Sequence, residues 1–110
     1  MGREQLLEGY CLLLPDPVVA HLNDFEGAER DQFLQDMAKL GDAVMKETGC
    51  IRVNYAIFGN LEPALHAHVI PRYACEPEEF RTRPYFSYDM ASAPMFDSAV
   101  HGELLARIRA

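Results

Sequence analysis

The chain has little basic charge for its size. Of its 110 residues, 10 are Lys or Arg and 17 are Asp or Glu, so the formal net charge is −7. Proteins that bind nucleic acids usually carry a basic surface that displaces counterions from the phosphate backbone, and no basic stripe is present here. Repulsion by distant carboxylates is screened within roughly 8–10 Å at physiological salt. We therefore expect no nucleic-acid partner, whereas a small anionic ligand is compatible with the composition.

Long hydrophobic runs and paired cysteines are also missing. An apolar run such as Cys11–Leu14 is far shorter than the ~20 residues that a membrane-spanning helix needs. The start, Met1–Gln5, lacks the apolar region of a secretory signal. Cys11, Cys50 and Cys75 are widely spaced and form no CxxC motif, which argues against a disulfide framework or a thiolate zinc site. We expect reduced thiols, no membrane partner and a cytoplasmic location.

The spacing of apolar residues predicts one long amphipathic helix. Between residues 28 and 47, apolar side chains recur at intervals of four, three and four residues, at Phe33, Met37, Leu40 and Val44. This spacing places them on one face of a helix. Gly49 follows as a predicted C-terminal stop. The helix is expected to cover one face of a sheet.

Three strands and a second helix complete the prediction. Residues 9–14 are a short apolar run that ends at Pro15, and we predict that they form the first strand. Residues 18–25, which include His21, are predicted to be an irregular connection. Residues 51–58 and 64–73 are predicted strands, and the loop of about five residues between them favours antiparallel pairing. Residues 96–109 look helical. The expected fold class is α+β, in a single domain over residues 1–110.

Two histidines lie one residue apart in the second of these paired strands. Because side chains alternate faces along a strand, His66 and His68 should point to the same side. Such a pair can be a polar stripe on a half-exposed strand, a metal site or part of a phosphate site. The preceding loop, Gly59–Pro63, offers backbone N–H groups and the amide of Asn60. That combination suits a phosphate.

The residues around this pair resemble the histidine triad (HIT) family, whose signature is three histidines at alternate positions followed by apolar residues and often by Pro-Arg. The match is PALHAHVIPRY, in which His66 takes the middle position, His68 the third, and Ala64 stands in place of the first histidine. The wider strings RVNYAIFGNLEPALHAHVIPRY and GYCLLLPDPVVAHLNDF are similar to bacterial HIT-like proteins often labelled as dinucleoside polyphosphate hydrolases. The resemblance runs from about Gly9 to Arg72.

The resemblance implies a HIT-like antiparallel sheet and a role for each residue of the motif. In the family the middle histidine attacks the α-phosphate and forms a nucleotidyl-histidine, which assigns the nucleophile to His66. His68 would donate a hydrogen bond to a phosphate or bridging oxygen. Gly59 and Asn60 correspond to the phosphate-contacting loop. Asn54 either lines the pocket or caps a turn.

Two departures from the family keep an alternative open. Ala64 removes one imidazole, and because the first predicted strand lies close to residue 1, we expect that the chain lacks the N-terminal segment of family members. A catalytically weak nucleotide-binding module is therefore the second hypothesis. A metal-binding HxH protein is the third, although no further ligand falls at a diagnostic spacing, so no metal ligand is assigned.

The remaining expectations concern cofactors, partners and two motifs beside the histidines. No cofactor is required, and a divalent cation would be bound together with the substrate. The partner is a nucleotide or dinucleotide, and the family resemblance favours a homodimer. Arg72 is expected to form a surface ion pair in preference to contacting phosphate. The aromatic residues Tyr85, Phe86 and Tyr88 are expected to pack on a core or a partner in preference to stacking on bases.

Overall fold

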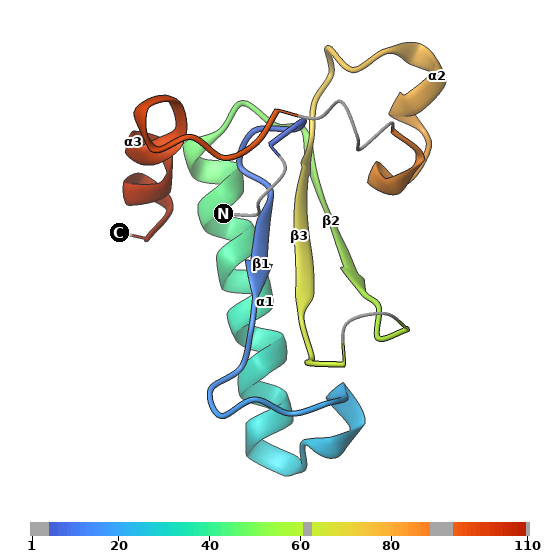
Figure 1. The fold of residues 1–110 in the computed structure, drawn as a ribbon, viewed down its shortest axis with the longest axis vertical. Helices are drawn as coiled ribbons and strands as arrows, with labels where there is room; N and C mark the ends of the chain where they lie inside the picture. The colour runs from blue at the N-terminus through green and yellow to red at the C-terminus, as the bar shows by residue number, and fades with distance from the viewer. Residues whose placement is uncertain (1–4, 61–62, 89–93, 110) are drawn as a thin grey trace.

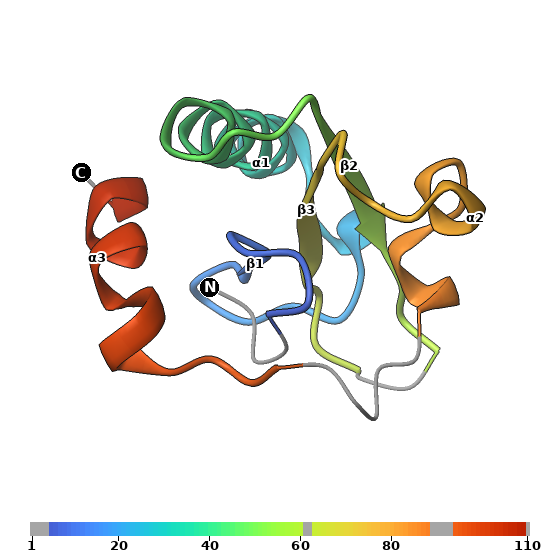
Figure 2. The same cartoon turned by 90° about the horizontal axis from the view of Figure 1, so that it is seen from above.

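The structure, a computed structural model, describes residues 5–60, 63–88 and 94–109, and its centre is a three-stranded antiparallel sheet (Figure 1). The strands are β1 (Cys11–Leu13), β2 (Arg52–Ile57) and β3 (Ala67–Arg72), in the spatial order β1-β3-β2. The helices are α1 (Gly27–Glu47), α2 (Glu78–Arg81) and α3 (Ser98–Arg109). Figure 2 shows α1 and α3 on one side of the sheet and α2 on the other. The α+β architecture is as predicted.

Helix α1 presents the predicted apolar stripe to the sheet. Phe33 and Val44 are buried, while Met37 and Leu40 are partly buried against the core. The helix ends at the predicted residue, but Gly49 does not end it, since it lacks a left-handed backbone. The Thr48 hydroxyl and backbone N–H both donate to the carbonyl of Val44 instead, 2.7 and 3.0 Å away. The helix end is therefore capped by a side chain.

Strands β2 and β3 form the predicted antiparallel pair, in register from Arg52 opposite Arg72 to Ile57 opposite Ala67. Their connection is longer than predicted, because β3 begins at Ala67 and residues 58–66, nine in all, lie between the strands. The backbone N–H of Leu65 donates to the carbonyl of Val19, 2.8 Å away, so it pairs with the 18–25 connection and not with β2. The 18–25 connection therefore binds the backbone of residue 65, which a longer β3 would have paired with β2.

Strand β3 lies in the middle of the sheet, and all six of its residues are buried. Val69 packs with α1 and α3 in one cluster of apolar side chains, whereas Ile70 packs on the opposite face. Because faces alternate along the strand, His68, Ile70 and Arg72 share that opposite face, which we call the histidine face. The C-terminal helix begins two residues later than predicted and packs against α1.

Residues 76–88, for which the sequence predicted no element, contain α2 and a 3₁₀ turn, Tyr85–Ser87. Tyr85 is buried in the same cluster as Tyr10 and Ile70, which holds this segment on the histidine face. The three cysteines are free thiols. In the described part of the chain, no helix combines the length and the apolar character that crossing a membrane requires.

Candidate active site

His66 and His68 lie next to each other on the histidine face. Their ring centroids are 4.9 Å apart and the ring planes meet at 75°. His66 precedes the first residue of β3, so it stands just outside the strand that was predicted to hold both histidines. The two rings nevertheless share one surface, as the alternation in the sequence predicted. His66 is half-buried, and His68 retains 9% of its surface.

A backbone carbonyl sets the orientation of the His66 ring. Nδ1 of His66 lies 2.8 Å from the carbonyl oxygen of Ala64. A carbonyl oxygen only accepts hydrogen bonds, so the Nδ1–H donates and the neutral ring keeps its lone pair on Nε2. The contact uses the backbone of residue 64 and is therefore independent of the missing first histidine. His66 is held in the tautomer that a nitrogen nucleophile needs.

A tyrosine from β1's side of the sheet contacts His68. The Tyr10 hydroxyl lies 2.6 Å from Nδ1 of His68, and both side chains are buried. Burial, and secondly the charge of His66, lower the pKa of His68 from its usual 6.5. A neutral His68 that accepts from Tyr10 carries its proton on Nε2, where it can donate to a ligand. The sequence did not indicate this contact, because it depends on a segment 58 residues away.

Two half-exposed phenylalanines flank His68. The ring centroids of Phe58 and Phe86 lie 5.9 and 5.1 Å from that of His68, and 5.4 Å from each other. Phe58 is 51% exposed and Phe86 is 43% exposed. Of the aromatic cluster predicted to pack on a core, Tyr85 does so, while Phe86 reaches the histidines. Apolar rings thus flank His68, which keeps 9% of its surface, while the neighbouring His66 stays half-buried.

The other predicted site residues are Gly59, Asn60 and Asn54, which lie on β2 and in the loop that follows it. Gly59 and Asn60 are exposed and directly follow Phe58, so they begin the loop that leads to the histidines. Residues 61 and 62 of that loop lie outside the described residues. Asn54 does not cap a turn: it lies in β2, and its Oδ1 accepts a hydrogen bond from Arg72 at 3.0 Å. Phosphate contact by these residues stays a prediction.

Arg72 forms an ion pair, but the prediction that this pair lies on the surface is wrong. Arg72 is 6% exposed, and its guanidinium donates to both carboxylate oxygens of Glu76 at 3.0 Å. It also donates to the backbone carbonyls of Phe80 and Arg83, at 2.9 and 2.6 Å. The α2 segment folds over β3 and removes the pair from water. Sequence spacing alone could not show this, because the covering segment comes later in the chain.

A cavity of about 600 Å³ lies on the histidine face between β2 and the segment that contains α2. Phe58 and Phe86, the two neighbours of His68, line one part of it. Asn54, Ala56 and four arginines are among its other lining residues. Neither His66 nor His68 lines this cavity, but it lies next to the two phenylalanines that flank His68.

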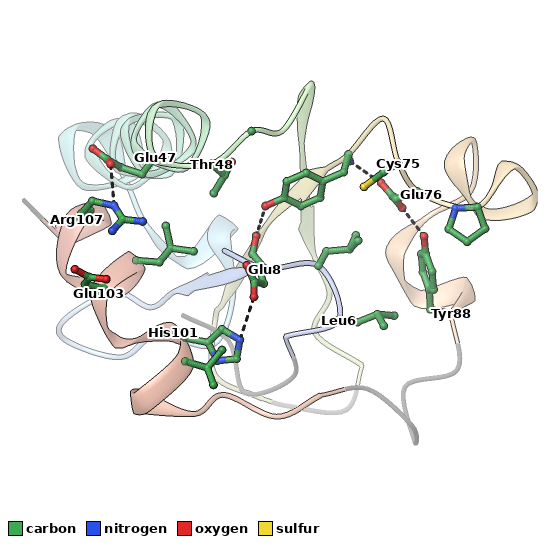
Figure 3. A pocket seen from close by; sticks show the side chains of 16 residues that line it. Leu6, Glu8, Glu47, Thr48, Cys75, Glu76, Tyr88, His101, Glu103 and Arg107 are labelled. Carbon is green, nitrogen blue, oxygen red and sulfur yellow. Dashed lines mark hydrogen bonds and ion pairs between the residues drawn. The ribbon is translucent and has the colours of Figure 1, made fainter.

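A second cavity, of about 700 Å³, is lined by parts of α3, the end of α1 and residues 6–8 (Figure 3). Its polar side chains are mostly paired with each other: His101 lies 3.7 Å from Glu8, and Arg107 lies 3.3 Å from Glu47. Neither His66 nor His68 lines it. Although larger, it is separate from the candidate chemistry, which we place at the histidines.

Metal binding at the pair finds little support. Within residues 5–60, 63–88 and 94–109, no group of three or more His, Cys, Asp or Glu side chains is placed to hold an ion. Two imidazoles alone leave a transition metal short of the three or four protein ligands that its sites usually have. The arrangement instead offers one lone pair, on Nε2 of His66, and one adjacent N–H donor, on His68.

Comparison with known proteins identifies relatives. The HIT domain family profile matches residues 5–75. A histidine triad protein of Bradyrhizobium japonicum has a similar structure, with a TM-score of 0.82 and 22% identity over 97% of this chain and 77% of that one. A histidine triad (HIT) protein of Sinorhizobium meliloti 1021 gives a TM-score of 0.83 and 19% identity over 97% and 76%. No curated protein has a significant match.

Proposed function

The chain belongs to the HIT domain family, and on that premise we propose that it is a nucleotide hydrolase or nucleotidyl transferase. It attacks the α-phosphate of a nucleoside phosphate derivative, and dinucleoside polyphosphates are the favoured class. The observation that carries the proposal is the hydrogen bond from Nδ1 of His66 to the carbonyl of Ala64. That bond keeps the lone pair of the half-buried ring on Nε2.

The reaction has two displacements. In the first, Nε2 of His66 forms a bond to phosphorus, and the bond between phosphorus and the leaving oxygen breaks with its electron pair on that oxygen. In the second, water attacks phosphorus, the P–N bond breaks, and the electron pair returns to Nε2. The water loses a proton, and a nucleoside monophosphate is released. Another hydroxyl or amine in place of water would make the protein a transferase.

His68 stabilises charge in both displacements. Its neighbour Tyr10 occupies Nδ1, and the proton on Nε2 can donate to a phosphate oxygen or to the leaving oxygen. The lowered pKa of His68 keeps this ring neutral at neutral pH. The chemistry needs no resident cofactor, since imidazole supplies the nucleophile. A divalent cation would enter with the phosphates of the substrate.

The lack of the first histidine is compatible with activity in this geometry. His66 is oriented by the backbone of Ala64 and not by its side chain. The substitution still removes one donor from the phosphate site, and this supports the second candidate, a nucleotide-binding module of weak activity that retains the fold. Both candidates predict nucleotide binding, so only a measurement of turnover distinguishes the enzyme from the binding module.

The experiment is to incubate the protein with a dinucleoside polyphosphate radiolabelled at its α-phosphates and to look for an acid-labile, base-stable phosphoramidate. The native protein should form it and release labelled nucleoside monophosphate. His66→Ala should form neither. His21→Ala is the matched control, because His21 is exposed in the 18–25 connection and should leave both signals unchanged. Label that persists in His66→Ala would contradict the assignment, and binding without turnover by the native protein would favour the second candidate.

A further inference from the structure

The cavity beside the histidines concentrates basic side chains in an acidic protein. Of the 10 Lys and Arg residues of the chain, four arginines line it, and Glu76 is the carboxylate among its lining residues. The four come from three places in the fold: Arg52 from β2, Arg72 from β3, and Arg81 and Arg83 from α2 and the residues after it. We call this space the arginine cavity.

Three of these arginines have no acidic partner in the described structure. Arg72 is buried and is satisfied by Glu76 and backbone carbonyls. Arg52, Arg81 and Arg83 are exposed, and no carboxylate of the described residues lies within 4.0 Å of their guanidinium groups. Their charges are therefore available to a ligand. Exposed arginines that converge on one cavity without counterions create a local field that favours anions despite the net charge of the protein.

Strand β2 connects this charge to the histidines. Arg52, Asn54 and Ala56 alternate along the histidine face, with Ala56 opposite His68 and Arg52 opposite Arg72. Four residues of strand separate the two ends, a distance of about 13 Å. Asn54 lies between them, with its Oδ1 bound to Arg72 and its amide N–H₂ left to donate. A chain of phosphates laid along β2 would meet His68 at one end and, beyond Ala56, the donors of Asn54 and Arg52.

We propose that the arginine cavity binds the phosphates of the substrate that lie beyond the phosphorus attacked by His66. The inference rests on the proposed function and narrows its substrate class to nucleotide derivatives whose leaving group carries two or more further phosphates. Guanidinium groups suit this role, because their planar donors pair with two phosphate oxygens at once. The aromatic rings of Phe58 and Phe86 line this cavity and also contact His68, so the cavity lies next to the residue that would face the attacked phosphate.

The first test is direct binding of inorganic tripolyphosphate, measured by isothermal titration calorimetry at low salt. The native protein should bind, and added salt should weaken binding, since the sites are exposed. The double variant Arg81→Gln/Arg83→Gln should bind about tenfold more weakly, because it loses two charge-assisted contacts. Arg109→Gln is the matched control: Arg109 is exposed on α3, on the far side of the molecule from α2 (Figure 1), and its loss should leave binding unchanged. Equal binding by the double variant, or no binding by the native protein, would overturn the proposal.

The second test compares two substrates, a dinucleoside tetraphosphate and a nucleoside monophosphate ester with an uncharged leaving group. The double variant should reduce the ratio of kcat/KM for the first to that for the second by about tenfold, whereas Arg109→Gln should preserve the ratio. An unchanged ratio would contradict the arginine cavity while the proposed function stands.

The two hypotheses also fail separately in the binding assay. His66→Ala should retain the affinity of the native protein for tripolyphosphate, because the arginines remain. If the native protein turns over neither substrate yet loses tripolyphosphate affinity in the double variant, the arginine cavity stands as a polyphosphate site and the proposed function is wrong.

Discussion

At the scale of single residues, two hydrogen bonds decide where the protons of the histidine pair reside. The carbonyl of Ala64 holds the proton of His66 on Nδ1, and the Tyr10 hydroxyl occupies the corresponding nitrogen of His68. One ring therefore exposes a lone pair and the other an N–H. Neither contact requires a third histidine, which is why a chain with alanine at residue 64 can still arrange its two imidazoles for different tasks.

Replacement of Tyr10 by phenylalanine tests the second of these bonds. The ring would stay in the core, but Nδ1 of the buried His68 would lose its partner. An unpaired buried polar atom costs about 1–3 kcal/mol, so the free energy of unfolding measured in urea should fall by that amount. Turnover should fall as well, since His68 is no longer held in one tautomer. Tyr55→Phe, a change on a half-exposed tyrosine of β2, serves as the control. Unchanged stability in Tyr10→Phe would argue against the bond.

The pKa of His68 predicts a dependence of stability on pH. Burial, and secondly the charge of His66, place this pKa below the usual 6.5. The unfolded chain therefore binds more protons than the folded one as the pH falls below about 6.5, and acid destabilises the fold. The contribution of His68 to the free energy of unfolding is complete above about pH 6.5. It is lost as the pH falls through the pKa of His68 in the folded protein. Unfolding of the native protein and of His68→Gln at about pH 7.5 and about pH 5 should show their difference in free energy shrinking at the lower pH. A difference independent of pH would contradict the shift.

At the scale of elements, the buried pair of Arg72 and Glu76 attaches the α2 segment to the sheet. Burial alone would raise the pKa of Glu76, but hydrogen bonds from Arg72, Tyr88 and the backbone of Tyr73 outweigh it and lower that pKa. Burial and then the Glu76 carboxylate raise the pKa of Tyr88 to about 12, so its hydroxyl remains a donor. The ion pair between Arg72 and Glu76 therefore persists across the physiological pH range. It holds the segment that places Phe86 beside His68.

Removal of Glu76 should release this element. Glu76→Leu would leave the Arg72 guanidinium buried without its carboxylate, which costs roughly 3–5 kcal/mol of unfolding free energy in comparable pairs. Urea unfolding measures the loss, and changes in the ring resonances of Phe86 in NMR spectra should report its displacement from His68. Glu79→Gln, on the exposed surface of α2, should change stability by no more than about 0.5 kcal/mol. Similar stabilities for the two variants would show that the pair does not hold the segment.

At the scale of the whole molecule, the homodimer expected from the family resemblance stays a prediction. In the described sheet β2 is an edge strand; Tyr55 and Ile57 on it are 44% and 37% exposed, and Ile51 just before it is 59% exposed. An edge with apolar side chains and unpaired backbone groups can pair with the same edge of a second copy. Light scattering after size-exclusion chromatography should give twice the mass of one chain.

A charge at this edge should separate the copies. Ile57→Lys is expected to shift the protein to the mass of one chain, because burying an unpaired ammonium in an interface is unfavourable. Val100→Lys, at an apolar position on α3 that is 65% exposed, should leave the mass unchanged. If the native protein has the mass of one chain, the prediction of a homodimer is wrong. If both variants have the mass of one chain, the interface is not specific to the β2 edge.

Local pattern was enough to predict the main elements and the shared surface of the histidines. The spacing of Phe33, Met37, Leu40 and Val44 repeats with the period of a helix, and the alternation around His66 and His68 repeats with the period of a strand. Such patterns act between neighbours in the chain, so they can be read without knowing the fold. The HIT resemblance added the expected roles of these residues, and the comparisons confirm the family.

Only the tertiary structure decided how these parts are joined. The length of β3 depends on a hydrogen bond between Leu65 and Val19, the partner of His68 is Tyr10, and Arg72 becomes buried because residues 76–88 fold over it. Each of these contacts links segments whose approach costs chain entropy and is repaid by burial elsewhere, so no local pattern encodes it. The sequence by itself determined which side chains are available for phosphate chemistry, and the packing of distant segments decided their protons, their neighbours and the arginines that face them.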